Sequence, residues 1–167
     1  MEARFNLFDS ATSTKLAKRF AGAALVFEES PLPRELRELV QLRVSQINGC
    51  AACVDMHTKE AVAAGESEHR LNMVAVWREA TVFTEAERAA LAMAEEGTRL
   101  ADAFEGVSDE TWATVRKHFD EDQTGTLICL IAFINAANRM NIIARVPGGE
   151  YQAGAAAEFL ENASPAH

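Results

Sequence analysis

The sequence predicts an all-α fold, and three observations support this prediction. Alanine, leucine, glutamate and arginine, which favour helix, are abundant among the 167 residues. Apolar residues recur at helical spacing along most of the chain. No segment sustains the alternation of apolar and polar residues that is typical of a strand. The length and the composition, with 49% hydrophobic and 25% charged residues, fit one globular domain over residues 1–167.

Two prolines separate the first two predicted helices. The first helix should cover about residues 13–28, because Leu16, Phe20 and Phe27 lie at helical spacing. Pro31 and Pro33 then interrupt the chain, and Pro33 suits the first turn of the second helix. The apolar stripe of this second helix consists of Leu36, Leu39, Val40, Val44 and Ile47.

A very short turn joins the second helix to the third. Asn48-Gly49 ends the second helix, and the third should run from about Cys50 to Ala64 with Gly65 as its C-cap. The sequence therefore predicts an antiparallel helical hairpin.

Capping patterns mark the later helices. A helix is expected over about residues 66–78, and the TEAE sequence at 84–87 is a capping box that opens a helix to about Leu100. Ser108 opens another helix. The last long helix, about residues 123–144, is apolar on nearly every side, which is typical of a bundle centre or a subunit interface. Pro147-Gly148-Gly149 ends it, and a short helix is expected in the tail that follows.

The charge and the terminus limit the partners and the compartment. A net charge of −9 argues against nucleic acid or an anionic membrane as the partner, because both would require a basic patch. The amino terminus, MEARFNLFDSATSTKLAKRF, lacks the apolar core and cleavage site of a signal peptide. The most apolar segment, Leu127–Ala137, is shorter than the roughly 20 residues that span a membrane. We therefore expect a cytoplasmic protein.

Cysteine spacing provides the most specific functional signal. Three cysteines are too few for a disulfide framework, so a closely spaced pair indicates redox or metal chemistry. Cys50 and Cys53 form such a pair, and His57 follows four residues later. Cys129 lies within the apolar segment LICLIAFI, where we expect it to be a small residue of the core.

On one helix, Cys50, Cys53 and His57 would lie within an arc of about 60°. The start of a helix favours a thiolate, and the second sulfur is near enough to form a disulfide. His57 can serve as a general base for a thiol. The helix dipole favours Cys50 as the attacking thiol, whereas the i, i+4 spacing to His57 favours Cys53. The residues alone leave this choice open.

Glu38 is the candidate carboxylate for a relay with His57. In a hairpin that turns at Asn48-Gly49, the heights of Glu38 and His57 differ by about one helical turn. Glu38 nevertheless lies off the apolar stripe of its helix, and periodicity alone places it on a solvated face. The sequence therefore leaves two positions open for Glu38, one facing His57 and one on the solvated face of its helix.

The cysteine pair admits three other interpretations. A zinc site usually gathers ligands from two separated pairs, and no second pair exists. A thioredoxin-type site would follow a β-strand in an α/β pattern, which this chain lacks. The pair could also be buried for structural reasons alone, with His57 satisfied in the core.

The whole pattern consists of Glu38, Cys50, Cys53 and His57, with eleven, two and three residues between them. It resembles the AhpD-like alkylhydroperoxidase branch of the carboxymuconolactone decarboxylase family. The segments INGCAACVDMHTKEAVAAGES, WREATVFTEAERAALAMAE and LICLIAFINAANRMNIIARVPGG are similar to this family in the same order. The resemblance covers about residues 30–148, with an N-terminal helix and a C-terminal tail added.

The resemblance implies an all-helical subunit that forms homo-oligomers, trimers or hexamers, and a peroxidase site without metal or haem. Cys53 matches the cysteine that attacks the peroxide, Cys50 its resolving partner, and Glu38 and His57 the proton relay. A hydroperoxide is the implied substrate, and a dithiol or lipoyl-type protein the implied reductant. In the best-studied branch, a second histidine precedes the second cysteine, where this chain has Ala52.

We therefore expect a thiol-dependent peroxidase that cycles between the Cys50/Cys53 dithiol and its disulfide. One alternative is a family member with lactone decarboxylase or another non-redox activity, although decarboxylation would not require two cysteines. Another is a redox-sensing or partner-binding protein that uses the disulfide as a switch.

The remaining polar and aromatic residues are expected to have structural roles. Surface or capping positions are predicted for His69, His118 and His167. Core positions are predicted for Trp77 and Trp112. For Asn135, Asn138 and Arg139 the first interpretation is structural hydrogen bonding across an interface, and the second is contact with a substrate.

Overall fold

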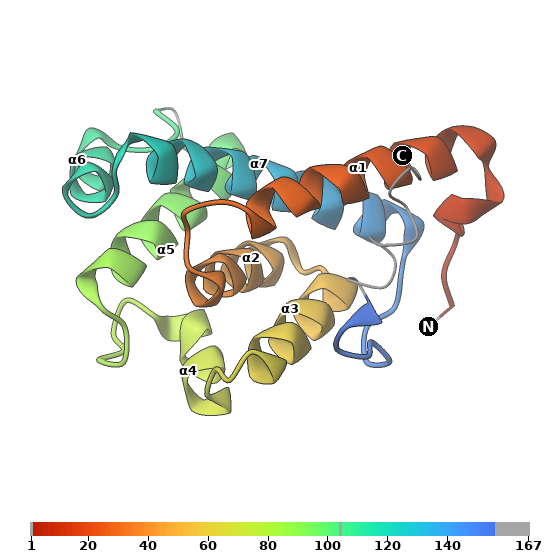
Figure 1. The fold of residues 1–167 in the computed structure, drawn as a ribbon, viewed down its shortest axis with the longest axis horizontal. Coiled ribbons are helices and arrows are strands. Elements are labelled where there is room, and N and C mark those ends of the chain that lie inside the picture. The colour runs from red at the N-terminus through yellow and green to blue at the C-terminus, as the bar shows by residue number, and fades with distance from the viewer. Residues whose placement is uncertain (1, 104, 156–167) are drawn as a thin grey trace.

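The structure is a computed structural model that describes residues 2–103 and 105–155. Within these ranges every regular element is a helix, which confirms the all-α prediction (Figure 1). The α-helices are α1 (Ala11–Glu28), α2 (Arg34–Asn48), α3 (Ala51–Ala63), α4 (Glu68–Met73), α5 (Glu85–Thr98), α6 (Asp109–His118) and α7 (Glu121–Ala144). Short 3-10 helices are η1 (Leu7–Asp9), η2 (Val74–Val76) and η3 (Leu100–Asp102).

Helix α2 lies in the middle of the molecule, with α3 on one side and α7 on the other (Figure 1). One face of α2, with Val40 and Val44, belongs to a core cluster shared with α5, α6 and α7. Another face, with Leu39 and Leu42, belongs to a second cluster shared with α3, α4 and the segment that follows η2. Because α2 is covered on both sides, a single apolar stripe does not describe which of its residues are buried.

The predicted start and stop signals are confirmed at most helix ends. Thr84 and Glu87 form a capping box at α5, and the Ser108 side chain caps α6. Gly49 ends α2 in the left-handed conformation, with φ of 72°. A second capping box, of Asp120 and Gln123, starts α7 two residues earlier than the apolar pattern indicates.

Several expectations from the sequence are wrong. The helix expected over residues 66–78 is only the short α4 followed by η2. Trp112 is 41% exposed, and Cys129 is also exposed, so neither is a core residue. Cys129 lies on α7, which is apolar on nearly every side, so periodicity cannot show which side the rest of the chain covers. Trp112 lies on α6, whose buried residues are Thr111 and Val115. The short tail helix is expected within residues 151–167, most of which lie outside the described ranges.

Helix α7 has buried polar residues on its inner side and exposed apolar residues, Ile128, Ile142 and Ile143, elsewhere on its surface. Asn135 and Asn138 are buried on its inner side, and Phe133 stacks on Phe20 of α1 with ring centroids 4.1 Å apart. By length and composition alone α7 could cross a membrane, a test that the core helix of a globular protein also passes. Its buried asparagines and its packing on α2 and α5 are those of a core helix.

Candidate functional site

The α2–α3 turn places Cys50 between two helices. The amide of Cys50 donates to the Ser45 carbonyl and that of Gly49 to Gln46, which is the Schellman pattern of a helix C-terminus. Cys50 is also the N-cap of α3, with its carbonyl accepting from Val54. Cys50 therefore lies just before α3 in extended conformation, and Cys53 lies within the first turn of the helix.

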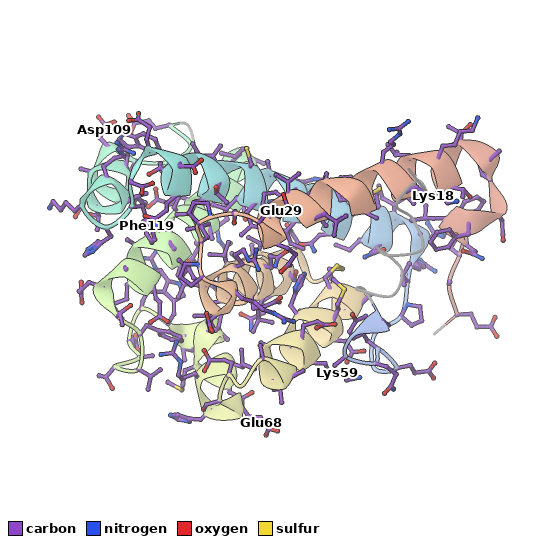
Figure 2. The ribbon with its side chains drawn as sticks, in the orientation of Figure 1. Lys18, Glu29, Lys59, Glu68, Asp109 and Phe119 are labelled. Carbon is purple, nitrogen blue, oxygen red and sulfur yellow. A yellow bond between two sulfur atoms is a disulfide. The ribbon has the colours of Figure 1, made fainter. Side chains whose placement is uncertain are left out.

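Cys50 and Cys53 are joined by a disulfide, with their Cα atoms 5.4 Å apart. Figure 2 shows this bond at the start of α3. Each cysteine is only 1% exposed. The structure therefore shows the oxidised form of the pair, held under cover at a helix N-terminus, where the helix dipole favours a thiolate after reduction.

A network of asparagines fastens this turn to α7. The side-chain amide of Asn48 donates to the Asn135 and Asn138 side chains, at 2.9 Å in each case. Asn138 in turn donates to the Ser45 hydroxyl at 3.1 Å. Asn135 and Asn138 do form structural hydrogen bonds, but these partners lie within the same chain, whereas the sequence predicts an interface. Because buried amides must be paired, this network holds Cys50 in one position.

Glu38 and His57 form a buried pair between α2 and α3. Glu38 Oε2 lies 2.9 Å from His57 Nδ1, and the two residues are 8% and 5% exposed. The expectation that Glu38 faces His57 is confirmed, and its placement on a solvated face is wrong. The second core cluster explains the difference, because it covers the side of α2 that carries Glu38.

The pairing with Glu38 determines what His57 can do. A carboxylate that accepts from Nδ1–H leaves Nε2 as the free basic nitrogen of a neutral imidazole. His57 Nε2 is buried and has no hydrogen-bond partner in the part of the chain that the structure describes. Since His57 follows Cys53 by four residues on α3, both side chains lie on the same helix face. The arrangement can therefore accept a proton beside the thiols and return it.

Asn141, near the end of α7, makes a contact with the disulfide that the sequence pattern does not indicate. Its Nδ2 lies 3.3 Å from Cys53 Sγ. No spacing rule could have related Asn141 to Cys53, because the two residues are 88 positions apart and meet only through helix packing.

A segment after α7, residues 146–154, lies along α3 and is called the strap below. The Asp55 carboxylate accepts from the backbone amides of Gly149 and Tyr151, at 2.7 and 2.9 Å. Lys59 donates to the carbonyl of Tyr151 at 2.8 Å and pairs with Asp55. The hydrogen bond from Lys59 and those from the two amides hold the pKa of Asp55 below its usual value, so this anchor is charged at neutral pH.

Gly148 brings the strap against the first turn of α3. A Cβ atom at this position would overlap with the Ala51 carbonyl group. Only glycine allows this approach, and it places the strap directly over the residues between the two cysteines.

We expect Gly148→Ala to lower the free energy of unfolding by about 1–3 kcal/mol, because the strap must move away from Ala51. Thermal unfolding of the oxidised protein measures this loss. Gly125→Ala is the matched control, since a Cβ there meets nothing within 4 Å on the exposed side of α7. Gly125→Ala should leave stability unchanged or raise it. Equal stability of Gly148→Ala and the wild type would contradict the prediction.

The four predicted site residues, Cys50, Cys53, His57 and Glu38, come together at the α2–α3 hairpin. His69 and His118 are exposed and remote, and His167 lies outside the described ranges. Among the residues that the structure describes, no three His, Cys, Asp or Glu side chains form a group that could hold a metal ion. The chemistry available here is that of two sulfurs, one imidazole and one carboxylate.

Comparisons with known proteins agree with this geometry. The model of the carboxymuconolactone decarboxylase family matches residues 14–96, which include all four site residues. The uncharacterized protein YdfG of Bacillus subtilis is 41% identical over 115 residues, covering 69% of this chain and 77% of YdfG.

Solved structures extend the match over most of the chain. ATU0492 from Agrobacterium tumefaciens, a protein of unknown function named as a candidate antioxidant defence protein AhpD, has a TM-score of 0.81 and 33% identity. The match covers 90% of this chain and all of ATU0492. An uncharacterized peroxidase-related protein from Ralstonia eutropha, with a TM-score of 0.69 and 20% identity over 84% of this chain and 73% of its own, shares the fold. The hairpin with its cysteine pair and the extent of these matches together show that the chain is an AhpD-like member of the carboxymuconolactone decarboxylase family.

Proposed function

We propose that this protein is a thiol-dependent peroxidase that reduces hydroperoxides through Cys50 and Cys53. The observation that carries the proposal is the disulfide beside a buried Glu38–His57 pair. A structural disulfide would not require a buried imidazole whose second nitrogen is unpaired within the described chain. A redox cycle does require such a base, because protons leave and return at the sulfurs in every turnover.

The cycle starts from the reduced pair. The thiolate of Cys53 attacks one oxygen of the hydroperoxide, so that an S–O bond forms and the O–O bond breaks. The departing alkoxide takes a proton, supplied by the His57 imidazolium, and leaves as the alcohol. His57 takes the proton of the Cys50 thiol, and the resulting thiolate attacks the sulfur of the Cys53 sulfenic acid. The S–S bond forms as the S–O bond breaks, and the departing hydroxide takes the proton from His57 and leaves as water.

An external dithiol restores the enzyme. Its thiolate attacks the Cys50–Cys53 bond, and the resulting mixed disulfide is resolved by the dithiol's second sulfur. The oxidised dithiol leaves, and both cysteines are again reduced. A dithiol or lipoyl-type protein is the reductant class that we propose. Both cysteines are almost fully covered in the oxidised form, and the strap lies against Ala51 between them, so we expect the strap to move when a protein reductant binds.

Ala52 leaves the proposed proton relay with one histidine. It stands where the best-studied branch of the family has a second histidine, so His57 is the imidazole that must serve both the attacking and the resolving sulfur. We expect this single-histidine relay to turn over more slowly than a two-histidine one.

Steady consumption of hydroperoxide with a dithiol donor tests the proposed function. The wild-type protein should consume many equivalents of peroxide per subunit. A redox switch, which the buried disulfide also fits, would consume one equivalent and stop. Consumption of a single equivalent would therefore overturn the peroxidase and favour the switch.

We also propose that the subunits form homo-oligomers through α7 and α1. Helix α7 exposes Ile128, Ile142 and Ile143, and α1, which has no buried residue, exposes Leu16 and Val26. Apolar surface of this kind is usually covered in the assembled protein. The molar mass in solution tests this, and a monomer at micromolar concentration would contradict it.

A further inference from the structure

Asn141 has a fixed backbone and a side chain aimed at the cysteine pair. Its carbonyl accepts from the Val146 amide at 2.9 Å, while the Arg145 amide donates to Ile142. This is a Schellman motif, in which Asn141 lies in the last turn of α7 and its carbonyl accepts from the first residue of the strap. Its side-chain Nδ2 lies 3.3 Å from Cys53 Sγ. The last turn of α7 therefore places the side-chain amide of Asn141 at hydrogen-bond distance from the sulfur of Cys53.

The strength of the hydrogen bond from Asn141 to Cys53 depends on the redox and protonation state of the sulfur. A disulfide sulfur is a weak, uncharged acceptor, and a thiol is not much better. A thiolate is an anion, and hydrogen bonds to ionised groups are roughly twice as strong as neutral ones. The Asn141 amide therefore stabilises the thiolate more than it stabilises either neutral form.

The two cysteines differ in this respect. Both lie at the N-terminus of α3 and receive the benefit of its dipole. Within residues 2–103 and 105–155, the side-chain donor at hydrogen-bond distance from this pair reaches Cys53 Sγ and not Cys50 Sγ. The difference between the two sulfurs thus comes from α7 and not from their own helix.

We propose that Asn141 is a catalytic residue that donates a hydrogen bond to the Cys53 thiolate and makes Cys53 the attacking cysteine. The inference rests on the thiol redox function proposed above, since it assigns a role to Asn141 at the same sulfur. It gives a structural reason for the attack by Cys53 that the family resemblance implies and that the residue spacing alone leaves open.

The test measures the pKa of the Cys53 thiol directly. A Cys50→Ser, Cys129→Ser background leaves Cys53 as the single cysteine, and the ultraviolet absorbance of its thiolate is followed against pH. In this background Asn141→Leu, which has a similar size and no donor, should raise the pKa of Cys53 by about one unit. Asn141→Asp should raise the pKa at least as much, because its carboxylate repels the thiolate.

The control is Asn72→Leu, the same substitution at an exposed asparagine of α4, which should leave the pKa of Cys53 unchanged. An unchanged pKa in Asn141→Leu, or a lowered pKa in Asn141→Asp, would overturn the inference. A shift of equal size in Asn72→Leu would overturn it as well. Asn141→Asp keeps the test decisive if Asn141→Leu does not fold.

The titration needs no peroxide, so its result is separable from the proposed function. If the wild type does not turn over peroxide but Asn141→Leu still raises the pKa of Cys53, the peroxidase proposal fails and the role of Asn141 at the thiolate stands. If the peroxidase is active and the pKa does not respond, the inference about Asn141 alone fails.

Discussion

Cys53→Ser is expected to lower dithiol-dependent peroxide consumption by at least about 10³-fold, which is the largest effect of any single change in this protein. A serine hydroxyl is almost entirely protonated at neutral pH and is a poor nucleophile toward an O–O bond, so the first step of the cycle is lost. The measurement is the rate of hydroperoxide loss at saturating dithiol.

Cys50→Ser separates the roles of the two cysteines. This variant should reduce about one equivalent of peroxide and then stop, because the Cys53 sulfenic acid has no partner for condensation. Trapping of the sulfenic acid by a sulfenic-acid-specific reagent would identify the intermediate. Cys129→Ser is the matched control and should retain wild-type turnover, since Cys129 is exposed on α7 and outside the site. Full turnover in both Cys50→Ser and Cys53→Ser would end the peroxidase hypothesis.

Glu38→Gln is expected to lower the rate of the thiol reaction by about 10²-fold without unfolding the protein. The carboxylate can only accept from His57 Nδ1, which leaves Nε2 as the base. An amide has a donor as well, and a glutamine that donates to Nδ1 would place the proton on Nε2. The base would then be lost while the shape of the site is preserved.

Glu35→Gln provides the control for this effect. It makes the same substitution on the same helix, at an exposed position one turn away from the site. Its rate and thermal unfolding should equal those of the wild type. A Glu38→Gln variant with a wild-type rate would show that the buried pair is structural, whereas loss of folding in Glu38→Gln would show that the charge itself stabilises the hairpin.

The fold and most of its helix ends were accessible from the sequence, because they depend on local chemistry. Thr84, Ser108 and Gly49 act within one turn of their own position, and each is found at the helix end that it predicts. Cys53 and His57 were equally accessible, since their spacing is fixed by the helix that carries them, and Cys50 precedes this helix as its N-cap. The helix predicted over about residues 66–78 shows the limit, because the structure has only the short α4 followed by η2 there. The length of a helix in this segment depends on how the segment packs on the helices around it.

Glu38 illustrates what periodicity misses. Its burial follows from α2 being covered on two sides, and a sequence pattern reports the strongest stripe of a helix and not the second one. For Trp112 and Cys129 the error is the opposite one, since both were predicted to be buried and both are exposed. An apolar residue on a helix is not necessarily covered by the rest of its own chain.

By itself the sequence determined an all-α chain, a hairpin turning at Asn48-Gly49, and a cysteine pair at the start of the helix that carries His57. Only the tertiary structure decided which distant residues meet that hairpin. Asn141 reaches Cys53, Asn135 and Asn138 hold Asn48, and Gly148 lies against Ala51, in every case across more than 80 residues of sequence. Such contacts depend on how α7 packs against α2 and α3, and no local preference of the chain encodes the relative position of helices so far apart.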